Sequence, residues 1–307
     1  MKKAIVTGAN GFVGSALVKE MLKHNIEVLA LDMPECNANI PNDERVKFIG
    51  LTLDEIEQLK DLVYDKNFDC FYHFAWAGVD VKNRENIELQ LNNVKWTIDC
   101  LKVAKQCGCK RFVGAGSIME DETLNAVSKA GNKAGMNYVY GASKLQAHLL
   151  SSMIAANINI ELVWCKLTNA YGVGEFSTRL INSTLRKIIN NEIPQFTSGE
   201  QNYDFVYIDD VARAFYLIGK NGKAFNEYLI GSSHARPLKE FLLEMKETVS
   251  PDREFIFGNI PFTGVSLPLN KFNTSKTEAD TGFKAEISFG EGCKKTMEWL
   301  KKVEVGK

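Results

Sequence analysis

The chain has 307 residues, of which 45% are hydrophobic and 24% charged, and its formal net charge at pH 7 is −1. This composition is typical of a soluble globular protein, and the length can bury a large core in one or two domains. The near-zero charge gives no electrostatic reason to expect a nucleic-acid or membrane partner. Without a signal-peptide pattern or an apolar stretch near the roughly 18–20 residues that span a bilayer, we expect a cytoplasmic protein.

The first predicted elements are a strand, a glycine-rich turn and a helix. Residues 3–7 have the apolar run of a buried strand, Gly8, Gly11 and Gly14 follow it, and residues 12–24 have helical apolar spacing. Free N–H groups in the first turn of such a helix can bind a phosphate. Gly8 suits the tight turn, Gly11 a close approach of a pyrophosphate, and Gly14 close packing of helix on strand. The alternative is a purely structural turn.

The second predicted strand, 26–32, ends in an acidic residue. Asp32 lies roughly 20 residues past the glycines, where a carboxylate can accept hydrogen bonds from the adenosine ribose hydroxyls. No Arg or Lys follows before Arg45, so a 2′-phosphate would meet Asp32 without a cation. This favours NAD over NADP. A turn former at the end of the strand is the alternative interpretation.

The alternation of strands and helices continues through the first half of the chain. We predict further strands at 45–49, 69–75, 111–116 and 159–166, and helices at 53–65, 85–107 and 138–156. The predicted fold class is α/β: a Rossmann-type doubly wound parallel sheet with a smaller C-terminal α/β substrate lobe. We assign 1–169 to the NAD(P)-binding domain, with 203–230 returning to it, and 170–202 and 231–307 to the substrate-binding lobe.

A tyrosine and a lysine share one face of the predicted helix 138–156. Tyr140 and Lys144 are four residues apart. A free tyrosine ionises at about pH 10, and a nearby cation favours the phenolate. Tyr140 could then exchange a proton with a substrate oxygen while a hydride moves to or from a nicotinamide. Ser117, at the end of strand 111–116, could bind the same oxygen. The alternatives are a surface tyrosine, a solvated lysine and a helix-capping serine.

Cysteine and histidine residues give no metal pattern. The seven cysteines are an odd number in a chain without a secretion signal, which indicates reduced thiols. Cys107 and Cys109 form the only close pair and lack a second pair at zinc spacing, so we expect no metal site. His73 lies inside an apolar run, where we expect a buried, hydrogen-bonded imidazole.

These segments together resemble the extended short-chain dehydrogenase/reductase family, and within it the NAD-dependent epimerase/dehydratase group that acts on nucleotide sugars. The resemblance covers nearly the whole chain. Residues 7–14 look like the cofactor loop, and Ser117, Tyr140 and Lys144 match the catalytic triad in order and separation. Further similar segments are 92–94, the sugar-nucleotide segment 166–172, and 203–212, which resembles a late R-D-F-V-x-V-D-D-V-A motif.

The resemblance implies an oxidoreductase with NAD as cofactor, NADP being less favoured, a nucleotide-sugar substrate, and a homodimer formed through two helices of the main domain. The implied cofactor contacts are Gly8, Asn10, Gly11, Phe12, Val13, Gly14, Asp32, Met33, Leu51, Thr52, Phe74, Ala75, Trp76, Asn93, Tyr140, Lys144, Leu167 and Thr168. The implied substrate contacts are Trp76, Ser117, Ile118, Met119, Asn169, Phe176, Arg179, Asn182, Tyr203 and Arg236.

Several positions depart from the pattern of this family. Tyr203 stands where many members have an arginine, which removes a bidentate pyrophosphate contact that Arg179, Arg186 or Arg236 could replace. Ile118 and Met119 stand in place of the Asp-Glu acid/base pair of 4,6-dehydratases and cannot transfer protons, which argues against dehydration. Leu51 stands in place of an aspartate that contacts adenine. Trp76 replaces a small residue and shapes the sugar pocket or fills the core.

We therefore expect hydride transfer at C4 of a nucleotide-activated hexose. An NDP-4-keto-6-deoxyhexose reductase is slightly favoured over an NDP-hexose 4-epimerase with tightly bound NAD. A non-catalytic dinucleotide-binding protein is a remote alternative, because such proteins generally lose the tyrosine or the lysine that Tyr140 and Lys144 supply here.

Overall fold

The computed structural model describes residues 1–80 and 82–305 and divides the chain into two compact units. The first unit comprises Met1–Leu167, Ala212–Ile230 and Ser275–Phe283, and the second comprises Thr168–Val211, Gly231–Thr274 and the residues from Lys284 onward. The segment that returns to the first unit begins at Ala212 and not at residue 203, and 275–283 also belongs there. Residues 306–307 of the predicted lobe lie outside the described residues.

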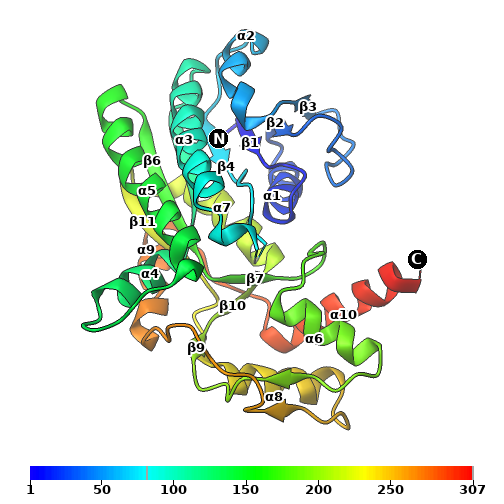
Figure 1. The fold of residues 1–307 in the computed structure, drawn as a ribbon. Helices are drawn as coiled ribbons and strands as arrows, with labels where there is room; N and C mark the ends of the chain where they lie inside the picture. Colours follow the sequence, from blue (N-terminus) through cyan, green and yellow to red (C-terminus); the bar gives the residue numbers. More distant parts are fainter. Residues whose placement is uncertain (81, 306–307) are drawn as a thin grey trace. The chain divides into compact units, whose positions relative to one another are not determined.

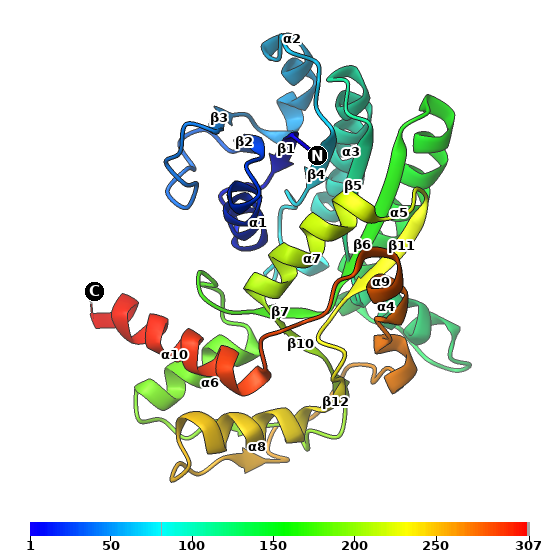
Figure 2. The same cartoon turned by 180° about the vertical axis from the view of Figure 1, so that it is seen from behind.

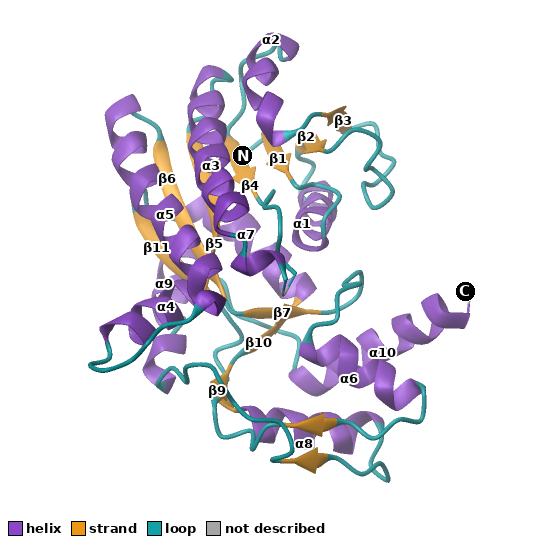
Figure 3. Ribbon diagram, viewed as in Figure 1, coloured by secondary structure: helices purple, strands orange, loops and turns teal. Residues whose placement is uncertain are grey.

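A seven-stranded parallel sheet forms the centre of the first unit, in the order β11-β6-β5-β4-β1-β2-β3 (Figures 1 and 3). The predicted fold class is confirmed. The strand order reverses between β1 and β4, and all the carboxyl ends share one edge, where ligands bind in such sheets. The strands are β1 (Lys3–Thr7), β2 (Glu27–Asp32), β3 (Val46–Gly50), β4 (Cys70–His73), β5 (Arg111–Ser117), β6 (Glu161–Leu167) and β11 (Asn226–Ile230), the last of which the sequence analysis did not predict as a strand.

Helices cover both faces of this sheet. Helices α3 (Ile87–Gln106) and α5 (Val139–Ile158) lie on one face (Figure 1), and α1 (Phe12–Lys23) and the part of α7 (Ile208–Asn221) from Ala212 onward lie on the other (Figure 2). The buried strand residues make a continuous core in which the rings of Phe71 and Phe112 stack with centroids 5.4 Å apart. The short helices α4 (Met119–Ser128) and α9 (Ser275–Thr281) complete the unit.

The predicted helix 53–65 is wrong in type for most of its length. The chain forms a 3₁₀ helix over Leu53–Gln58 and a single α turn, α2, over Leu59–Leu62. Leu53, Ile56 and Leu59 repeat every three residues, which is the period of a 3₁₀ helix, whereas an α-helix requires an average near 3.6. The buried and partly buried side chains follow the three-residue period up to Leu59, so this segment forms the tighter 3₁₀ helix and not the predicted α-helix.

The second unit contains short two-stranded sheets and three longer helices around an aromatic core. The rings of Phe205, Phe241 and Phe289 make the core, with the centroids of Phe241 and Phe289 4.9 Å apart. Its strand pairs are β7 (Asn169–Tyr171) with β10 (Phe205–Tyr207), β9 (Asn202–Tyr203) with β12 (Arg236–Pro237), and β8 (Gln195–Phe196) with β13 (Ile256–Phe257). Its longer helices are α6 (Leu180–Ile189), α8 (Leu238–Val249) and α10 (Phe289–Val305).

Among the described helices, none combines the length and the apolar character that crossing a membrane requires.

Candidate active site

The glycine turn after β1 has the shape of an anion site. Gly8 has a φ of +66°, its carbonyl accepts from the N–H of Gly11 at 3.0 Å, and Gly11 is the N-cap of α1. A Cβ at Gly14 would lie only 2.0 Å from the Gly8 oxygen, so α1 begins as close to the turn as backbone atoms permit. The first turn of α1 contains no acidic side chain, and its N–H groups have no partners within the helix. These features fit the pyrophosphate of a dinucleotide.

Asp32 at the end of β2 is positioned by backbone groups. Its Oδ2 accepts from the N–H of Asn10 at 2.8 Å, and its Oδ1 from the N–H of Met33 at 2.9 Å. Each carboxylate oxygen can accept more than one hydrogen bond, so both can also accept from ribose hydroxyls. The carboxylate thus fits the adenosine ribose of NAD, and its negative charge would repel a 2′-phosphate.

We expect Asp32→Ala to weaken NAD binding at least about 10- to 100-fold, because the loss of even one hydrogen bond to a charged group costs about 1.5–3 kcal/mol. The wild-type protein should prefer NAD to NADP, and the substitution should narrow that preference. Calorimetric titration with both cofactors measures the change, with Asp61→Ala on the exposed surface of α2 as the matched control. Equal wild-type affinity for NAD and NADP would contradict the role given to this carboxylate.

The structure places the predicted triad where β5 meets α5. Lys144 of α5 is 5% exposed, and its Nζ donates to the backbone oxygen of Ala115 in β5 at 2.7 Å. The ring centroid of Tyr140, one turn earlier, lies 5.9 Å from this Nζ, and Ser117 ends β5. Burial lowers the pKa of Lys144 to about 7, although the carboxylate of Glu120 opposes the shift. The lysine charge therefore changes near neutral pH.

The segment after β4 adds two side chains to this pair. The indole ring of Trp76 lies with its centroid 3.6 Å from the Lys144 Nζ and meets the Tyr140 ring at 77°, with a centroid separation of 6.0 Å. The guanidinium carbon of Arg84 lies 4.9 Å from the Tyr140 ring centroid. The sequence analysis placed Trp76 near the site but missed Arg84, because no spacing in the sequence connects an arginine of the short 3₁₀ helix Asn83–Glu85 to a residue of α5.

Two amides of α3 hold this segment. The Oε1 of Gln90 accepts from the Trp76 indole N–H at 2.8 Å, while its Nε2 donates to the backbone oxygens of Gly78 and Asn83 at 3.0 and 3.1 Å. The Oδ1 of Asn93 accepts from the N–H of Ala77 at 2.8 Å. Asn93, predicted to contact the cofactor, therefore orients the loop beside the predicted site.

A buried acid lies beneath the end of β5. The Oε1 of Glu120 accepts from the N–H of Ser117 at 2.8 Å and from the indole N–H of Trp164 at 3.1 Å. The Ser117 hydroxyl oxygen accepts from the N–H of Met119 at 3.2 Å, which ties the end of β5 to the start of α4. Ile118, a predicted substrate contact, is 3% exposed. The sequence analysis gave Glu120 no role. The only local indication is its place among the acidic residues in the first turn of α4, a helix that was not predicted.

Two further acids follow Glu120 in the first turn of α4. Asp121 is paired with Lys166 at 3.0 Å. Burial raises the pKa of Glu122 to about 7, against the opposing charge of Arg84. Neither Asp121 nor Glu122 stands at position 118 or 119, the two positions that correspond to the acid/base pair of the dehydratases.

His73 is buried and hydrogen-bonded, as predicted. The Thr97 hydroxyl donates to the backbone oxygen of Asn93, so the His73 Nε2 donates to Thr97 Oγ1 at 3.1 Å and its Nδ1 accepts from Thr7 at 2.8 Å. Burial, helped by the charge of Lys144, lowers the pKa of His73 to about 3, so the imidazole is neutral. No cluster of three or more potential metal ligands occurs among the described residues.

The remaining predicted cofactor contacts lie along the carboxyl edge of the sheet. Leu51 is buried, the Thr52 hydroxyl donates to Glu55 at 2.8 Å, and the Ala75 N–H donates to the Thr7 hydroxyl at 3.4 Å. Phe12 and Val13 begin α1, Phe74 follows β4, Leu167 ends β6, and the side chain of Met33 is exposed.

Within the second unit, the strand register places Arg236 directly opposite Tyr203. The two residues are Cα partners in the antiparallel pair of β12 and β9. The Arg236 guanidinium pairs with Glu244 and lies 4.1 Å from the ring centroid of Phe241. Among the candidate arginines Arg179, Arg186 and Arg236, it is therefore Arg236 that lies on the strand paired with Tyr203.

A buried aspartate organises the start of this unit. Asp204 accepts from the Thr168 hydroxyl at 3.2 Å and from the N–H of Ser232 at 2.8 Å, and its backbone oxygen accepts from the Asn169 amide at 3.1 Å. The Thr168 hydroxyl, predicted to bind cofactor, is thus engaged within the unit.

The other predicted substrate contacts differ in exposure. Phe176 is exposed and packs edge-on against Trp299, and the Arg179 Nε lies 3.7 Å from the carboxylate of Glu175. Asn182 is fully buried, and its amide donates to the backbone oxygen of Glu175. A buried carbonyl partner gives Asn182 a structural role in the turn before α6.

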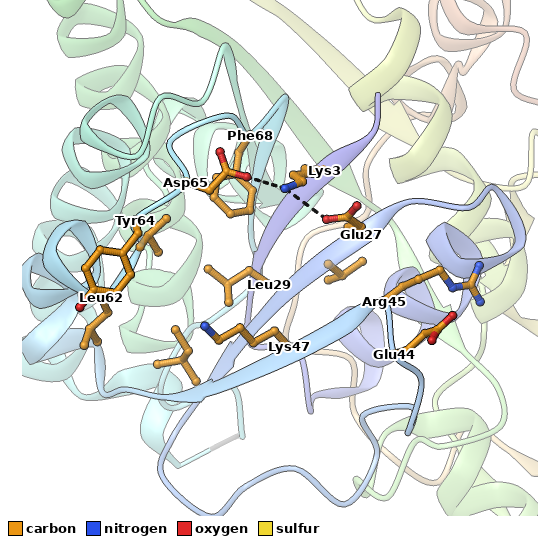
Figure 4. A pocket seen from close by; sticks show the side chains of 13 residues that line it. Lys3, Glu27, Leu29, Glu44, Arg45, Lys47, Leu62, Tyr64, Asp65 and Phe68 are labelled. Atoms are coloured by element: carbon orange, nitrogen blue, oxygen red, sulfur yellow. Dashed lines mark hydrogen bonds and ion pairs between the residues drawn. The ribbon is translucent and has the colours of Figure 1, made fainter.

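A hollow of about 530 Å³ lies on the sheet away from these groups (Figure 4). Lys3 lines it and pairs with Glu27 at 3.2 Å and with Asp65 at 2.5 Å. These residues lie at the amino ends of β1 and β2 and beyond α2, so the hollow is far along the strands from the glycine turn.

Comparisons with known proteins give a consistent family. Residues 4–231 match the NAD dependent epimerase/dehydratase family. The dTDP-D-glucose 4,6-dehydratase of Dictyostelium discoideum is 25% identical over 76% of this chain and 58% of its own length. A trifunctional Arabidopsis thaliana protein, UDP-glucose 4,6-dehydratase/UDP-4-keto-6-deoxy-D-glucose 3,5-epimerase/UDP-4-keto-L-rhamnose-reductase, is 23% identical over 97% of this chain. The chain spans only 47% of that protein's length.

A solved structure has the same fold. The UDP-N-acetylglucosamine 4-epimerase of Methanobrevibacter ruminantium, in complex with UDP-N-acetylmuramic acid, superposes with a TM-score of 0.81 at 20% identity, covering 98% of this chain and 99% of the other. The names of these three proteins carry different reactions, so the likeness identifies a family and a fold.

Proposed function

Since the chain belongs to the NAD-dependent epimerase/dehydratase family, we propose that it transfers a hydride at C4 of a nucleotide-activated hexose, acting as an NDP-4-keto-6-deoxyhexose reductase. The observation that carries this proposal is the contact of Lys144 with β5, which holds the Tyr140–Lys144 face of α5 against the carboxyl edge of the sheet. The glycine turn and Asp32 lie at the same edge, because β1, β2 and β5 are parallel.

Each side chain has a defined task in this proposal. The reduced cofactor NADH, when bound, would supply the hydride that C4 receives. Tyr140 gives its hydroxyl proton to the C4 carbonyl oxygen during reduction, and the Lys144 ammonium stabilises the phenolate that remains. Ser117 donates a hydrogen bond to the same oxygen and orients the carbonyl.

In the substrate lobe, we assign the diphosphate of the nucleotide sugar to Arg236. A guanidinium binds phosphate oxygens in a bidentate manner, and the one opposite Tyr203 compensates for the arginine that position lacks. Its contact with Phe241 fixes the guanidinium plane, while Glu244 competes for its charge. Asn169, held by Asp204, is the residue we assign to the sugar nucleotide.

An NDP-hexose 4-epimerase is the second candidate. The observation that favours it is the Asp32 carboxylate, fixed by two backbone N–H groups, because a permanently held NAD suits an enzyme that regenerates its own cofactor. The same triad would then first oxidise C4 and afterwards reduce it from the other face.

A direct assay separates the two reactions. We expect dTDP-4-keto-6-deoxyglucose to be reduced with consumption of NADH, and the purified protein to release no NAD on denaturation. Conversion of UDP-glucose to UDP-galactose without added cofactor, together with co-purified NAD in the mass spectrum, would establish the epimerase and overturn the reductase.

The homodimer stays a prediction. Exposed apolar side chains on α3 and α5 support it: Ile87, Leu91, Leu149 and Met153.

A further inference from the structure

Trp76 makes a direct contact with the charged group of the proposed catalytic pair. The Lys144 Nζ lies 3.6 Å from the Trp76 ring centroid, which places the ammonium in contact with the π electrons of the indole. The separation from the Tyr140 ring centroid is larger, at 5.9 Å. A tryptophan that only filled volume in the core would not require an ammonium group against its ring face.

The indole is held in this position from its opposite end. Its N–H donates to Gln90, which is fully buried and also donates to the backbone oxygens of Gly78 and Asn83. Rotation of the indole away from Lys144 would break a hydrogen bond to a buried amide. Gln90 of α3 therefore fixes the indole in contact with Lys144.

Lys144 has few other groups that compensate its charge. Its ammonium carries three N–H groups and donates one hydrogen bond to a backbone oxygen, that of Ala115. Among the described residues, no carboxylate lies within ion-pair distance of it, and Glu120 acts only through space. His73 is neutral.

We propose that Trp76 is a positioning residue whose indole face keeps Lys144 protonated and directed toward Tyr140. The inference rests on the proposed function, because it assigns Trp76 to the proton chemistry of the same pair. An indole is the aromatic ring that best binds a desolvated cation, so the tryptophan replaces the water that burial removes from the ammonium.

The sign of the effect follows from the two opposing influences. Burial favours the neutral amine and has already brought the pKa of Lys144 to about 7. The π face favours the ammonium, so its loss at constant burial lowers this pKa further. The ammonium is then lost at a lower pH, and the alkaline limb of the kcat profile moves downward by about one pH unit.

Fluorinated tryptophans at position 76 test this without changing the packing. Each added fluorine withdraws electron density from the ring while the shape stays nearly constant. We expect the Lys144 pKa, followed by NMR of ¹⁵N-labelled lysine in the cofactor-free protein, to fall stepwise with the number of fluorines. The same series at Trp96, whose indole N–H donates to Asp54, is the matched control and should leave the Lys144 titration unchanged.

Two side-chain replacements add a cruder comparison. Trp76→Phe and Trp76→Leu both lose the bond to Gln90, but only Phe keeps a π face, so the Lys144 pKa should be lower in the Leu variant. A Lys144 pKa that does not change with the number of fluorines on Trp76 would overturn the inference. A stepwise fall in a protein that turns over no sugar nucleotide would support the inference and refute the proposed function.

Discussion

Replacement of Tyr140 by Phe is expected to lower kcat by about 10²- to 10⁴-fold, the range that a positioned general acid or base contributes. The substitution removes one hydroxyl and keeps the ring that packs against Trp76 and Arg84. The Lys144 ammonium keeps its bond to Ala115, so the fold and the affinity for NAD should be preserved. Steady-state kinetics and calorimetric titration with NAD measure the two quantities.

Tyr138→Phe is the matched control for this experiment. Tyr138 is buried two residues before Tyr140, at the end of the 3₁₀ turn Met136–Tyr138, and is assigned no chemistry. Its substitution should leave kcat close to that of the wild type, because its hydroxyl has no part in the proposed proton transfer. Equal activity of Tyr140→Phe and the wild type would remove Tyr140 from the proton transfer.

The parts of the site that the sequence predicts are those built from residues close together along the chain. The glycine turn needs a strand, three glycines and a helix in succession, and the structure has them with Gly8 at a positive φ. Tyr140 and Lys144 share a face because four residues make about one helical turn. Asp32 ends β2, as its apolar run indicates.

The parts that escaped prediction depend on contacts between distant segments. Trp76 meets Lys144 because Gln90, 14 residues further on, fixes its indole, and no local pattern records that hydrogen bond. Glu120 lies beneath Ser117 because the indole of Trp164 reaches it from β6. The pairing of β11 with β6 becomes evident only in the assembled sheet.

Substitution of Gly14 by Ala is expected to destabilise the protein by about 3 kcal/mol or more, at the upper end of the cost of overpacking. The added Cβ would lie 2.0 Å from the Gly8 oxygen and 2.8 Å from its carbonyl carbon, and these are backbone atoms that cannot rotate away. To relieve the overlap, α1 must move away from the turn. Urea denaturation of the cofactor-free protein measures the free energy of unfolding.

Gly11→Ala separates packing from cofactor binding in the same turn. Gly11 has a φ of −72°, which any residue adopts, and an added Cβ would meet only the Gly8 oxygen, at 3.2 Å. Its free energy of unfolding should change by about 1 kcal/mol at most, because alanine adopts this φ and the tight contact with the Gly8 oxygen needs a shift of only a few tenths of an ångström, far less than at Gly14. NAD affinity should nevertheless fall, because the methyl group occupies the space in which the pyrophosphate approaches the backbone. Unchanged NAD affinity in a stable Gly11→Ala protein would mean that the turn serves packing alone.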